Sequence, residues 1–330
     1  MKRKAIILLA IICLASCNKD EEGITVSYTG LRTNLVSYDK NKDGILSEEE
    51  ALAVTYLIIT DDIKVAGSQD SIIDGLEYFP NLEILYIRAG NCISIDVSRN
   101  YKLKKITFGS DNKIKALDLT FNPELETLYC CGRKLESISL GSKNKLTELS
   151  FVGENNLRSL DLRGCPNLIT LGCDRSILTE LDVSHNPHLE TIGWSTGQLE
   201  SIDLSNNLKL KNLNCSANKL TTLDVSNNKE LFNLSCEGNK FTTLDVSKNT
   251  ELVWLTCGNI FLTVLDVSNN AKLESLDCRW TNITTLDVSN NFKLRQLLCT
   301  YNDNLATVYL KEGQTIESFR KDSHTTVVYK

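Results

Sequence analysis

The sequence has no excess of basic residues and no long hydrophobic run. Its 42 Asp and Glu residues outnumber its 36 Lys and Arg residues, which gives a net charge of −6 and a pI near 5.3. A nucleic-acid surface needs a basic stripe, so this balance argues against nucleic acid as a partner. The apolar run over residues 5–15 is too short for a membrane-spanning helix. We therefore expect that the chain spans no membrane.

Histidine is scarce, and no catalytic set of residues is visible. His185 and His188 share one loop without an evident third metal ligand, and His324 lies far off near the C-terminus. No Ser/His/Asp or Cys/His arrangement, paired-carboxylate pocket or phosphate loop can be assembled with any specificity. Because function has to be argued from a site, we expect that the protein is not an enzyme.

A repeat of 21 or 22 residues fills most of the chain. The stretch 231–251 has the pattern L-x-x-L-x-C-x-x-N-x-L-x-x-L-D-V-S-x-N-x-x, and the pattern recurs on both sides of it. A fixed period in this range indicates a solenoid, in which stacked repeats supply the core that no single repeat can form. The sixth position of the repeat is occupied by Ile87, Phe108, Cys130, Phe151, Cys173, Trp194, Cys215, Cys236, Cys257, Cys278 and Cys299.

The half-repeat L-x-x-L-x-C-x-x-N-x-L is similar to the leucine-rich repeat motif, with Cys in place of the usual third apolar residue. The short bacterial variety whose second half reads L-x-x-L-D-V-S-x-N is the best match, and the resemblance covers roughly residues 82–310. It implies a mostly β fold, a leucine-rich repeat solenoid of about eleven turns. Alternation places Leu234 and Cys236 inward and Ser235 outward, so both halves should form short strands in two parallel sheets.

Two polar columns run through the repeats. The Asn near the end of each repeat can bond loop groups of neighbouring turns. The Asp residues of LDVS should stack ~5 Å apart, where like charges repel by somewhat under ~1 kcal/mol per pair in water. Either neighbouring Thr, Ser and backbone donors compensate this repulsion, or cations do. The Asn column is Asn100, Asn122, Asn186, Asn207, Asn228, Asn249, Asn270 and Asn291, and the Asp column is Asp96, Asp118, Asp161, Asp182, Asp203, Asp224, Asp245, Asp266 and Asp287.

Twelve cysteines in an exported protein would ordinarily suggest disulfides. Most of them occupy the sixth position, which Phe and Trp also fill, so the site accepts an apolar filler. Parallel stacking also points their Cβ atoms the same way, which suits a disulfide poorly. We expect reduced thiols in the core, with a metal or redox ladder as the alternative.

Residues 1–16 are predicted to be a lipoprotein signal peptide and residues 17–27 a tether. The basic segment KRK at 2–4 precedes the apolar run, which ends in LASC at 14–17 and looks like a bacterial lipobox cleaved before Cys17. An ordinary secretory signal is the alternative. The following NKDEE resembles the run that directs Bacteroidetes-type lipoproteins outward, and a merely solvated tether is the alternative. We expect a lipid anchor in the outer membrane, facing the cell exterior.

Residues 28–60 are expected to form a small helical cap that resembles an EF-hand. The segment 39–50, DKNKDGILSEEE, fits the EF-hand calcium pattern at every constrained position. The alternative is a capping box that opens a helix without metal. That helix should run from residue 47 to about residue 59 and cover the first turn of the solenoid. The expected ligands of one Ca²⁺ ion are Asp39, Asn41 and Asp43 through side chains, Ile45 through its carbonyl, Ser47 through a water and Glu50 through two oxygens.

The outward positions of the two half-repeats differ in variety. Those of the LDVS half are monotonous, whereas those of the L-x-C half include aromatic and charged residues, the usual anchors of recognition surfaces. We expect a solenoid over 61–311 and a C-terminal cap over 312–330 with a strand at 325–329. The module should be a monomer that recognises a protein or glycan; the alternative is a structural or accessory lipoprotein of an outer-membrane complex. The candidate binding residues are Tyr86, Tyr129, Trp254, Asp277 and Arg279.

Overall fold

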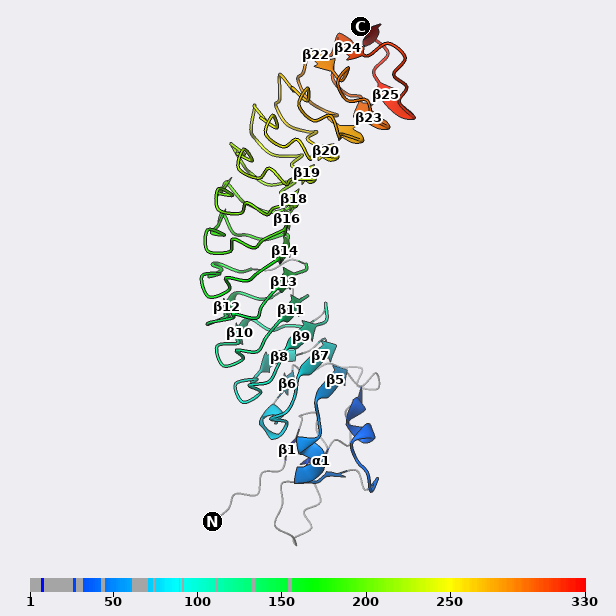
Figure 1. Ribbon diagram of the computed structural model, residues 1–330. Coiled ribbons are helices and arrows are strands. Elements are labelled where there is room, and N and C mark those ends of the chain that lie inside the picture. Colours follow the sequence, from blue (N-terminus) through cyan, green and yellow to red (C-terminus); the bar gives the residue numbers. More distant parts are fainter. Residues whose placement is uncertain are drawn as a thin grey trace. The chain divides into compact units, whose positions relative to one another are not determined.

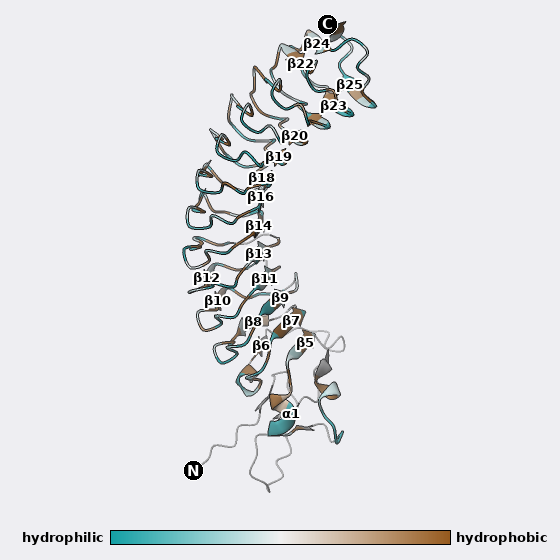
Figure 2. Cartoon of the chain, in the orientation of Figure 1, coloured by the Kyte–Doolittle hydropathy of each residue, from teal (hydrophilic) through white to brown (hydrophobic). Residues whose placement is uncertain are grey.

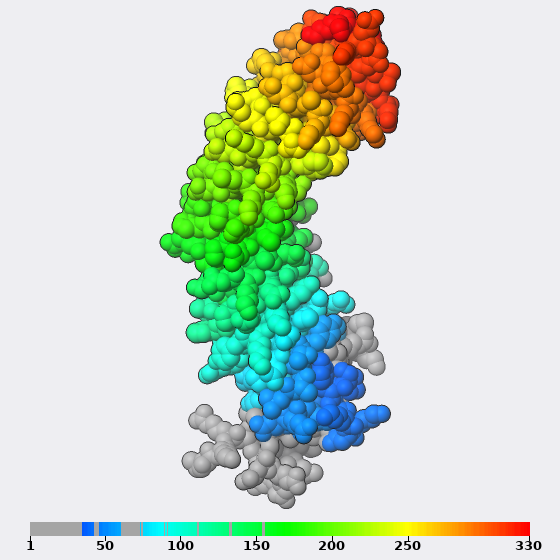
Figure 3. Space-filling model, viewed as in Figure 1, coloured from blue at the N-terminus to red at the C-terminus, as the bar shows by residue number. Residues whose placement is uncertain are grey.

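The computed structural model describes residues 7–8, 26–27, 32–42, 45–60, 71–73, 75–88, 90, 92–110, 112–131, 134–153 and 156–330. The chain divides into two compact units, unit 1 (Met1–Cys165) and unit 2 (Pro166–Lys330). Each unit is a stack of turns, and each turn adds a strand to a parallel sheet (Figure 1). The space-filling view shows the sequence colours changing in order along each unit, because every turn packs on its neighbours in the sequence (Figure 3).

The main sheet of unit 1 has the strand order β3-β5-β7-β9-β11-β13. Its neighbours are parallel except β3, which runs antiparallel to β5. A small sheet joins β1 (Ile7–Leu8), β2 (Val26–Ser27) and β4 (Ile45–Leu46). The main strands are β3 (Arg32–Thr33), β5 (Tyr56–Thr60), β7 (Ile84–Arg88), β9 (Lys105–Phe108), β11 (Thr127–Cys130) and β13 (Glu148–Phe151).

The main sheet of unit 2 has the strand order β14-β16-β18-β19-β20-β21-β23-β25, and all neighbours are parallel. Residues one repeat apart lie opposite each other, as Trp254 and Ser275 do. The strands are β14 (Thr170–Asp174), β16 (Thr191–Ser195), β18 (Asn212–Asn214), β19 (Asn233–Ser235), β20 (Trp254–Thr256), β21 (Ser275–Asp277), β23 (Gln296–Cys299) and β25 (Ser318–Lys321).

The core of each unit follows from the alternation of its strands. In β14 and β16 every second residue is buried, and Leu171 and Ile192 are fully enclosed. Figure 2 shows the corresponding change between hydrophobic and hydrophilic colours along the turns. All eleven sixth-position residues are buried, with at most 3% of each exposed. The predicted inward and outward assignment of the L-x-C strands is therefore confirmed.

The predicted second sheet is interrupted. On the LDVS side unit 1 has the pairs β6 (Ser71–Ile73) with β8 (Cys92–Ile95) and β10 (Ala116–Asp118) with β12 (Ser137–Ser139). Unit 2 has β15 (Glu180–Leu181) with β17 (Ser201–Ile202), and β22 (Thr285–Asp287), β24 (Thr307–Leu310) and β26 (Thr326–Tyr329) in one sheet. Each strand that leads into LDVS ends at or before the Asp of that motif. The Asp carboxylate accepts a hydrogen bond from the main-chain N–H two residues later, and this bond turns the chain out of the strand.

The Asn column holds successive turns together. The side-chain amide of Asn249 donates to the carbonyl oxygens of Val225 and Asn228, both at 2.9 Å, in the preceding turn. The same two bonds recur at Asn100, Asn122, Asn207, Asn228, Asn270 and Asn291. The carbonyl oxygens of Val225 and Asn228 also accept the main-chain N–H groups of Asn228 and Leu231 within their own turn. Each Asn therefore adds a second hydrogen bond to these oxygens, and this second bond joins one turn to the preceding one.

The N-terminal cap is not the predicted pair of helices. Among the described residues it contains one 3-10 turn, η1 (Asn34–Ser37), and one short helix, α1 (Glu48–Leu52). The helix predicted to continue to residue 59 is wrong from Ala53 onward, because Tyr56–Thr60 forms strand β5 at the start of the main sheet. Leu57 and Ile59 are both buried, and their separation of two residues is the period of a strand. Pairing of this segment with β7 stabilises the strand over the predicted helix.

The C-terminal end of unit 2 is closed by two strands. The strand predicted for residues 325–329 is confirmed as β26, which pairs with β24, and β25 adds an unpredicted strand beside β23. A second 3-10 turn, η2 (Leu76–Tyr78), precedes β7 in unit 1. No helix within the described ranges has the length and apolarity needed to cross a membrane.

Candidate binding surface

The strand face of unit 2 carries two exposed aromatic rings in contact. Trp254 opens β20 and points outward, while the next residue, Leu255, is 1% exposed. Phe232 precedes β19 by one residue, and the two rings meet edge to face with centroids 4.6 Å apart. They are 42% and 38% exposed. Edge-to-face contact fixes both rings, so the face presents a rigid apolar feature to solvent.

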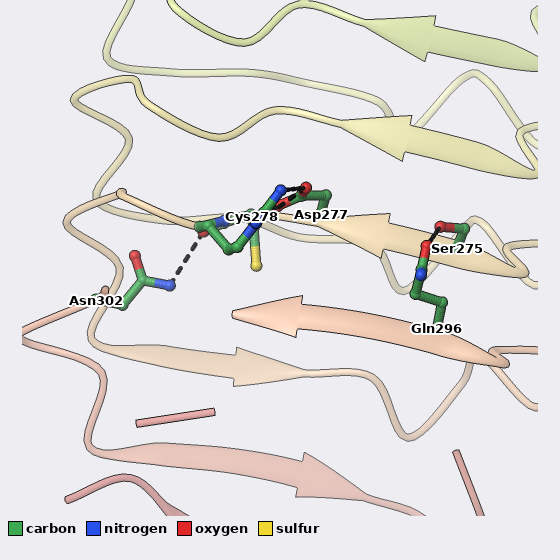
Figure 4. Close-up of polar contacts among 6 residues, drawn as sticks. Ser275, Asp277, Cys278, Gln296 and Asn302 are labelled. Atoms are coloured by element: carbon green, nitrogen blue, oxygen red, sulfur yellow. Dashed lines mark hydrogen bonds and ion pairs between the residues drawn. The ribbon is translucent and has the colours of Figure 1, made fainter. Parts of the chain in front are cut away.

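An oriented ion pair lies one strand further along the same face. The guanidinium of Arg279 donates from Nε to Asp277 Oδ1 at 2.9 Å and from Nη2 to Asp277 Oδ2 at 2.6 Å. The bond to Asp277 raises the pKa of Arg279. Asp277 lies opposite Thr256 of β20, and Figure 4 shows its carboxylate and the Cys278 sulfur on opposite sides of the strand. A bidentate ion pair of this kind fixes the orientation of the guanidinium group.

The outer face of the unit 1 sheet carries a separate group of tyrosines. The Lys105 ammonium lies between the rings of Tyr86 and Tyr129, 5.8 and 5.5 Å from their centroids. Tyr129 donates its hydroxyl hydrogen to Glu148, and this bond is the main cause of a raised Tyr129 pKa. A second ring, Tyr56, meets Tyr86 edge to face at 5.7 Å.

The five predicted binding residues thus fall into two groups. Tyr86 and Tyr129 share the outer face of unit 1, and Trp254, Asp277 and Arg279 share the outer face of unit 2. Within each group the side chains are brought together by the 21-residue register, which places equivalent positions on adjacent strands.

Unit 2 has a ridge of left-handed residues that the sequence reading missed. Two residues after the sixth position, the backbone has φ between 53° and 66° in seven consecutive turns. The main-chain N–H of Ala217 donates to the carbonyl of Glu237 in the next turn, and Asn259 repeats this bond to Arg279. We call these residues the αL ridge: Arg175, Thr196, Ala217, Gly238, Asn259, Trp280 and Tyr301.

Two large aromatic residues stand in this ridge. The rings of Trp280 and Tyr301 stack with centroids 4.1 Å apart and an angle of 7° between their planes, and they are 58% and 53% exposed. A left-handed backbone at a non-glycine residue costs about 1–3 kcal/mol, whereas Gly238 occupies the same position at no such cost. An aromatic residue two places after a sixth-position Cys was the available signal in the sequence.

The candidate calcium loop places two carboxylates close together. Asp39 and Glu50 are 5% and 6% exposed. The pKa of Glu50 is lowered, first by the N–H of Ser47 and then by the N–H of Lys40, which lie 2.9 and 2.8 Å from the carboxylate. The charge of Asp39 opposes this lowering as the smallest of the causes. The N–H of Lys42 lies 2.6 Å from Asp39 Oδ1.

The capping box that was the alternative for this segment is present. Ser47 caps α1 through its hydroxyl, which accepts from the N–H of Glu50, while Glu50 accepts from the N–H of Ser47. Asp43 lies outside the described residues, and of Ile45 only the backbone in β4 is described. Within the described part of the chain, no three His, Cys, Asp or Glu side chains form a metal-binding group. Two buried carboxylates of like charge still suit a hard cation.

The Asp column is compensated by hydrogen-bond donors. At every one of the nine positions, Oδ1 accepts the main-chain N–H two residues on, at 2.8–3.0 Å. In Asp224 the Ser226 N–H and then its hydroxyl lower the pKa, although Asp203 and Asp245 raise it. The backbone donors that the first alternative requires are therefore present at all nine positions, and at Asp224 they outweigh the repulsion from its neighbours.

The cysteine column packs as a core element. Cys215, Cys236, Cys257, Cys278 and Cys299 are fully buried and carry free thiols. Burial raises the pKa of Cys215 to about 12 and that of Cys257 further. A thiol that stays protonated is a poor metal ligand and nucleophile. The predicted burial is confirmed for these five residues, and their reduced state stays a prediction.

A small hollow of about 150 Å³ lies in unit 1 beside α1 and η2. Its lining is mixed, with two acidic side chains and an aromatic ring around apolar groups: Glu48, Ala51, Leu52, Glu77, Tyr78 and Pro80. The hollow is smaller than a ligand pocket of ordinary size, which is about 300–1,000 Å³.

Cys17, the predicted lipidation site, lies outside the described residues.

The stacked turns, the parallel main sheets and the asparagine column define a leucine-rich repeat fold. The chain is similar to the functional domain of InlJ from Listeria monocytogenes, which includes a cysteine ladder: identity is 26%, coverage is 84% of this chain and 73% of that one, and the TM-score is 0.57. It is also similar to the internalin InlF of Listeria monocytogenes, at 22% identity, coverage of 89% and 92% and a TM-score of 0.64. The leucine-rich repeat domain of APL1B matches at 18% identity, coverage of 81% and 83% and a TM-score of 0.62. No protein-family model and no curated protein matches the sequence.

Proposed function

We propose that this chain is a binding module that recognises a protein partner through the outer strand face of unit 2. The observation that carries the proposal is the exposed Phe232–Trp254 pair beside the oriented Asp277–Arg279 pair. Aromatic residues and arginine are the usual anchors of protein interfaces. Leucine-rich repeat proteins are typically interaction modules, which supports a binding role for this chain.

The face is organised before any partner binds. Edge-to-face contact restrains Trp254, and the bidentate ion pair restrains Arg279. The ion pair does not use Nη1 of Arg279, which can donate a hydrogen bond to a partner. Ordering side chains on binding costs about 0.5–1.5 kcal/mol each, so residues already held in place lose less entropy on association.

A protein array probed with the fragment 18–330 tests the proposal. Trp254→Ala should weaken binding of a recovered partner by about 2 kcal/mol or more. The matched control is Phe292→Ala, which removes a ring that is also exposed (57%) but lies outside the strands of the sheet. Asp245→Asn should have little effect.

Two outcomes would contradict the strand-face proposal. If Asp245→Asn abolishes binding while Trp254→Ala does not, the partner binds the Asp column. If no protein binds, the strand face of unit 2 is not a protein-binding surface, and the alternative of a structural or accessory lipoprotein gains support.

We propose that a lipid on Cys17 tethers the module to the outer membrane, with the solenoid facing the cell exterior. The basic segment, the apolar run and the LASC sequence support this placement. Cys17→Ser should move the protein from the membrane fraction to the soluble fraction. Retention of the variant in the membrane fraction would show that the lipobox reading is wrong.

We further propose that the loop 39–50 binds one Ca²⁺ ion through Asp39, Asn41, Asp43, Ile45, Ser47 and Glu50. The buried, like-charged carboxylates of Asp39 and Glu50 support this assignment, because a cation would relieve their repulsion. Glu50 would have to exchange part of its capping-box bonding for the ion. Binding to the folded state alone would stabilise it by about 2.7 kcal/mol at roughly a hundredfold excess over Kd.

Calorimetry with CaCl₂ separates the calcium loop from the capping box. The wild type should release or absorb heat and gain thermal stability with calcium, and Glu50→Gln should lose both effects. Glu49→Gln is the control, because Glu49 belongs to the same helix and is exposed. An absence of heat and of any thermal shift in the wild type would leave only the capping box.

A further inference from the structure

The aromatic pair in the αL ridge is not required by the turn that carries it. Ala217 and Gly238 hold the same left-handed backbone, with φ of 53° and 66°. Their N–H groups donate to the next turn at 2.7 and 3.1 Å, and the N–H of Trp280 does so at 3.3 Å. A small side chain therefore completes the turn as well as a large one does, and glycine completes it without strain. The indole must be explained by what it does outside the turn.

The Trp280 indole stacks on an aromatic ring through one of its faces, and its other face is called the open face here. Tyr301 covers the stacked face, since the two rings are nearly parallel at 4.1 Å. The open face lies toward the turn that carries Asn259, and the next ridge position beyond it is Gly238. The side chains become smaller along the ridge from Trp280 to Asn259 to Gly238. We call the part of the ridge at Asn259 and Gly238 the shelf. More than half of Trp280 remains exposed.

The position of the stacked Trp280 and Tyr301 rings is fixed by neighbouring residues. Asp322 accepts the N–H of Tyr301 at 3.0 Å and that of Asn302 at 2.9 Å. The side chain of Asn302 in turn donates to the carbonyl oxygen of Cys278, two residues before Trp280, at 3.0 Å (Figure 4). The stacked rings are therefore held from both turns, and the open face is presented in one orientation.

Polar groups of low net charge surround the open face. Arg279 precedes Trp280 in the chain, and its charge is balanced by Asp277. The two-point bond uses Nε and Nη2, so Nη1 remains able to donate. The exposed amide of Asn259 adds a donor and an acceptor on the shelf. An apolar ring face bordered by planar polar groups suits a ligand that is flat and apolar on its faces and rich in hydroxyl groups at its rim.

We infer that Trp280 and Tyr301, with Asn259 and Arg279, form a carbohydrate-binding site for a neutral, β-linked glycan of glucose configuration. A pyranose with equatorial hydroxyl groups has C–H groups on both faces, and one face can stack on the indole while the rim hydroxyl groups bond Asn259 and Arg279. The balanced Asp277–Arg279 pair and the net charge of −6 disfavour an anionic sugar. This site adjoins the proposed protein-binding surface, with which it shares Arg279, but it does not use Trp254.

Cellotetraose is the probe, and titration calorimetry with the protein from residue 18 to 330 is the measurement. Trp280→Gly should lower the affinity by about tenfold or more, the loss expected for an anchor aromatic. Its thermal midpoint should stay level or rise, because glycine relieves the left-handed strain. Trp254→Ala should leave the cellotetraose affinity within about twofold, since Trp254 is not among the residues proposed to contact the sugar.

Three results would overturn the site. The first is an absence of cellotetraose binding by the wild type at millimolar concentration. The second is a Trp280→Gly variant that keeps its affinity but melts earlier, which would make the stack a structural element only. The third is a Trp280→Gly variant that loses a protein partner and not the sugar, which would assign the ridge to the protein-binding surface. Loss of protein binding in Trp254→Ala alone concerns only the strand face.

Discussion

The ammonium group of Lys143 donates to the carbonyl oxygen of Leu119 at 2.7 Å, in the place that a column Asn fills in other turns. Lys143 is fully buried. Desolvation lowers its pKa, although Cys165 and Asp118 oppose this. A lysine thus serves as a hydrogen-bond donor to the preceding turn, as Asn122 does one repeat earlier, but it brings a charge into the core.

Lys143→Asn should therefore stabilise unit 1 by about 1 kcal/mol at neutral pH, because an amide donates without a buried charge. In the wild type the folded state loses its proton at lower pH than the unfolded chain does. Stability should consequently rise as pH increases from the lowered folded value toward the ordinary 10.5. Urea unfolding at neutral and alkaline pH measures both effects, and Lys145→Asn is the exposed control. A less stable Lys143→Asn variant at neutral pH would contradict this account.

The asparagine column supplies a matched pair of neighbours for a stability test. Asn228 is 1% exposed and donates to Leu204 and Asn207, whereas Asn227 is exposed. Asn228→Ala should cost about 2 kcal/mol, because two buried hydrogen bonds to the preceding turn are lost at about 1 kcal/mol each. Asn227→Ala should change stability by no more than about 0.5 kcal/mol. Chemical denaturation of both variants measures the difference, and equal losses would refute the role given to the column.

The cysteine column should not react with thiol reagents in the native state. Thiol titration of the folded protein should leave Cys215, Cys236 and Cys257 unlabelled, since they are buried and burial raises their pKa. Cys131, which is partly exposed, should react before them. Cys257→Val should cost less than about 1.5 kcal/mol, because it nearly conserves volume. Rapid labelling of the column without unfolding would count against core packing.

The Asp column should make unit 2 sensitive to acid. The N–H groups of the following serines lower the pKa of Asp203, Asp224 and Asp245. These carboxylates then stabilise the fold above the unfolded pKa of about 3.9, and the contribution is lost as pH falls through the lower folded values. Replacing all three with Asn keeps an oxygen acceptor and removes the titration. The thermal midpoint of that variant should depend less on pH between about pH 4 and pH 2, and an unchanged dependence would place the acid-sensitive groups elsewhere.

Sequence periodicity predicted the repeats because each of their features recurs at one spacing. The sixth-position column, its burial and the asparagine bonds all follow from a chain that stacks on itself every 21 or 22 residues. The cap was mispredicted because residues 56–60 precede the first regular repeat. Their apolar pattern suits a helix or a strand, and only pairing with β7 selects the strand.

The sequence by itself determined the solenoid, the residues that fill its core and the donors that join its turns, since these depend on period and alternation alone. Tertiary structure decided which outward side chains meet. The stack of Trp280 on Tyr301, the Phe232–Trp254 contact and the use of Lys143 in place of Asn each depend on residues about one repeat apart. Those contacts arise from the handedness of the backbone at each turn and from side-chain direction, which a repeating letter pattern does not specify.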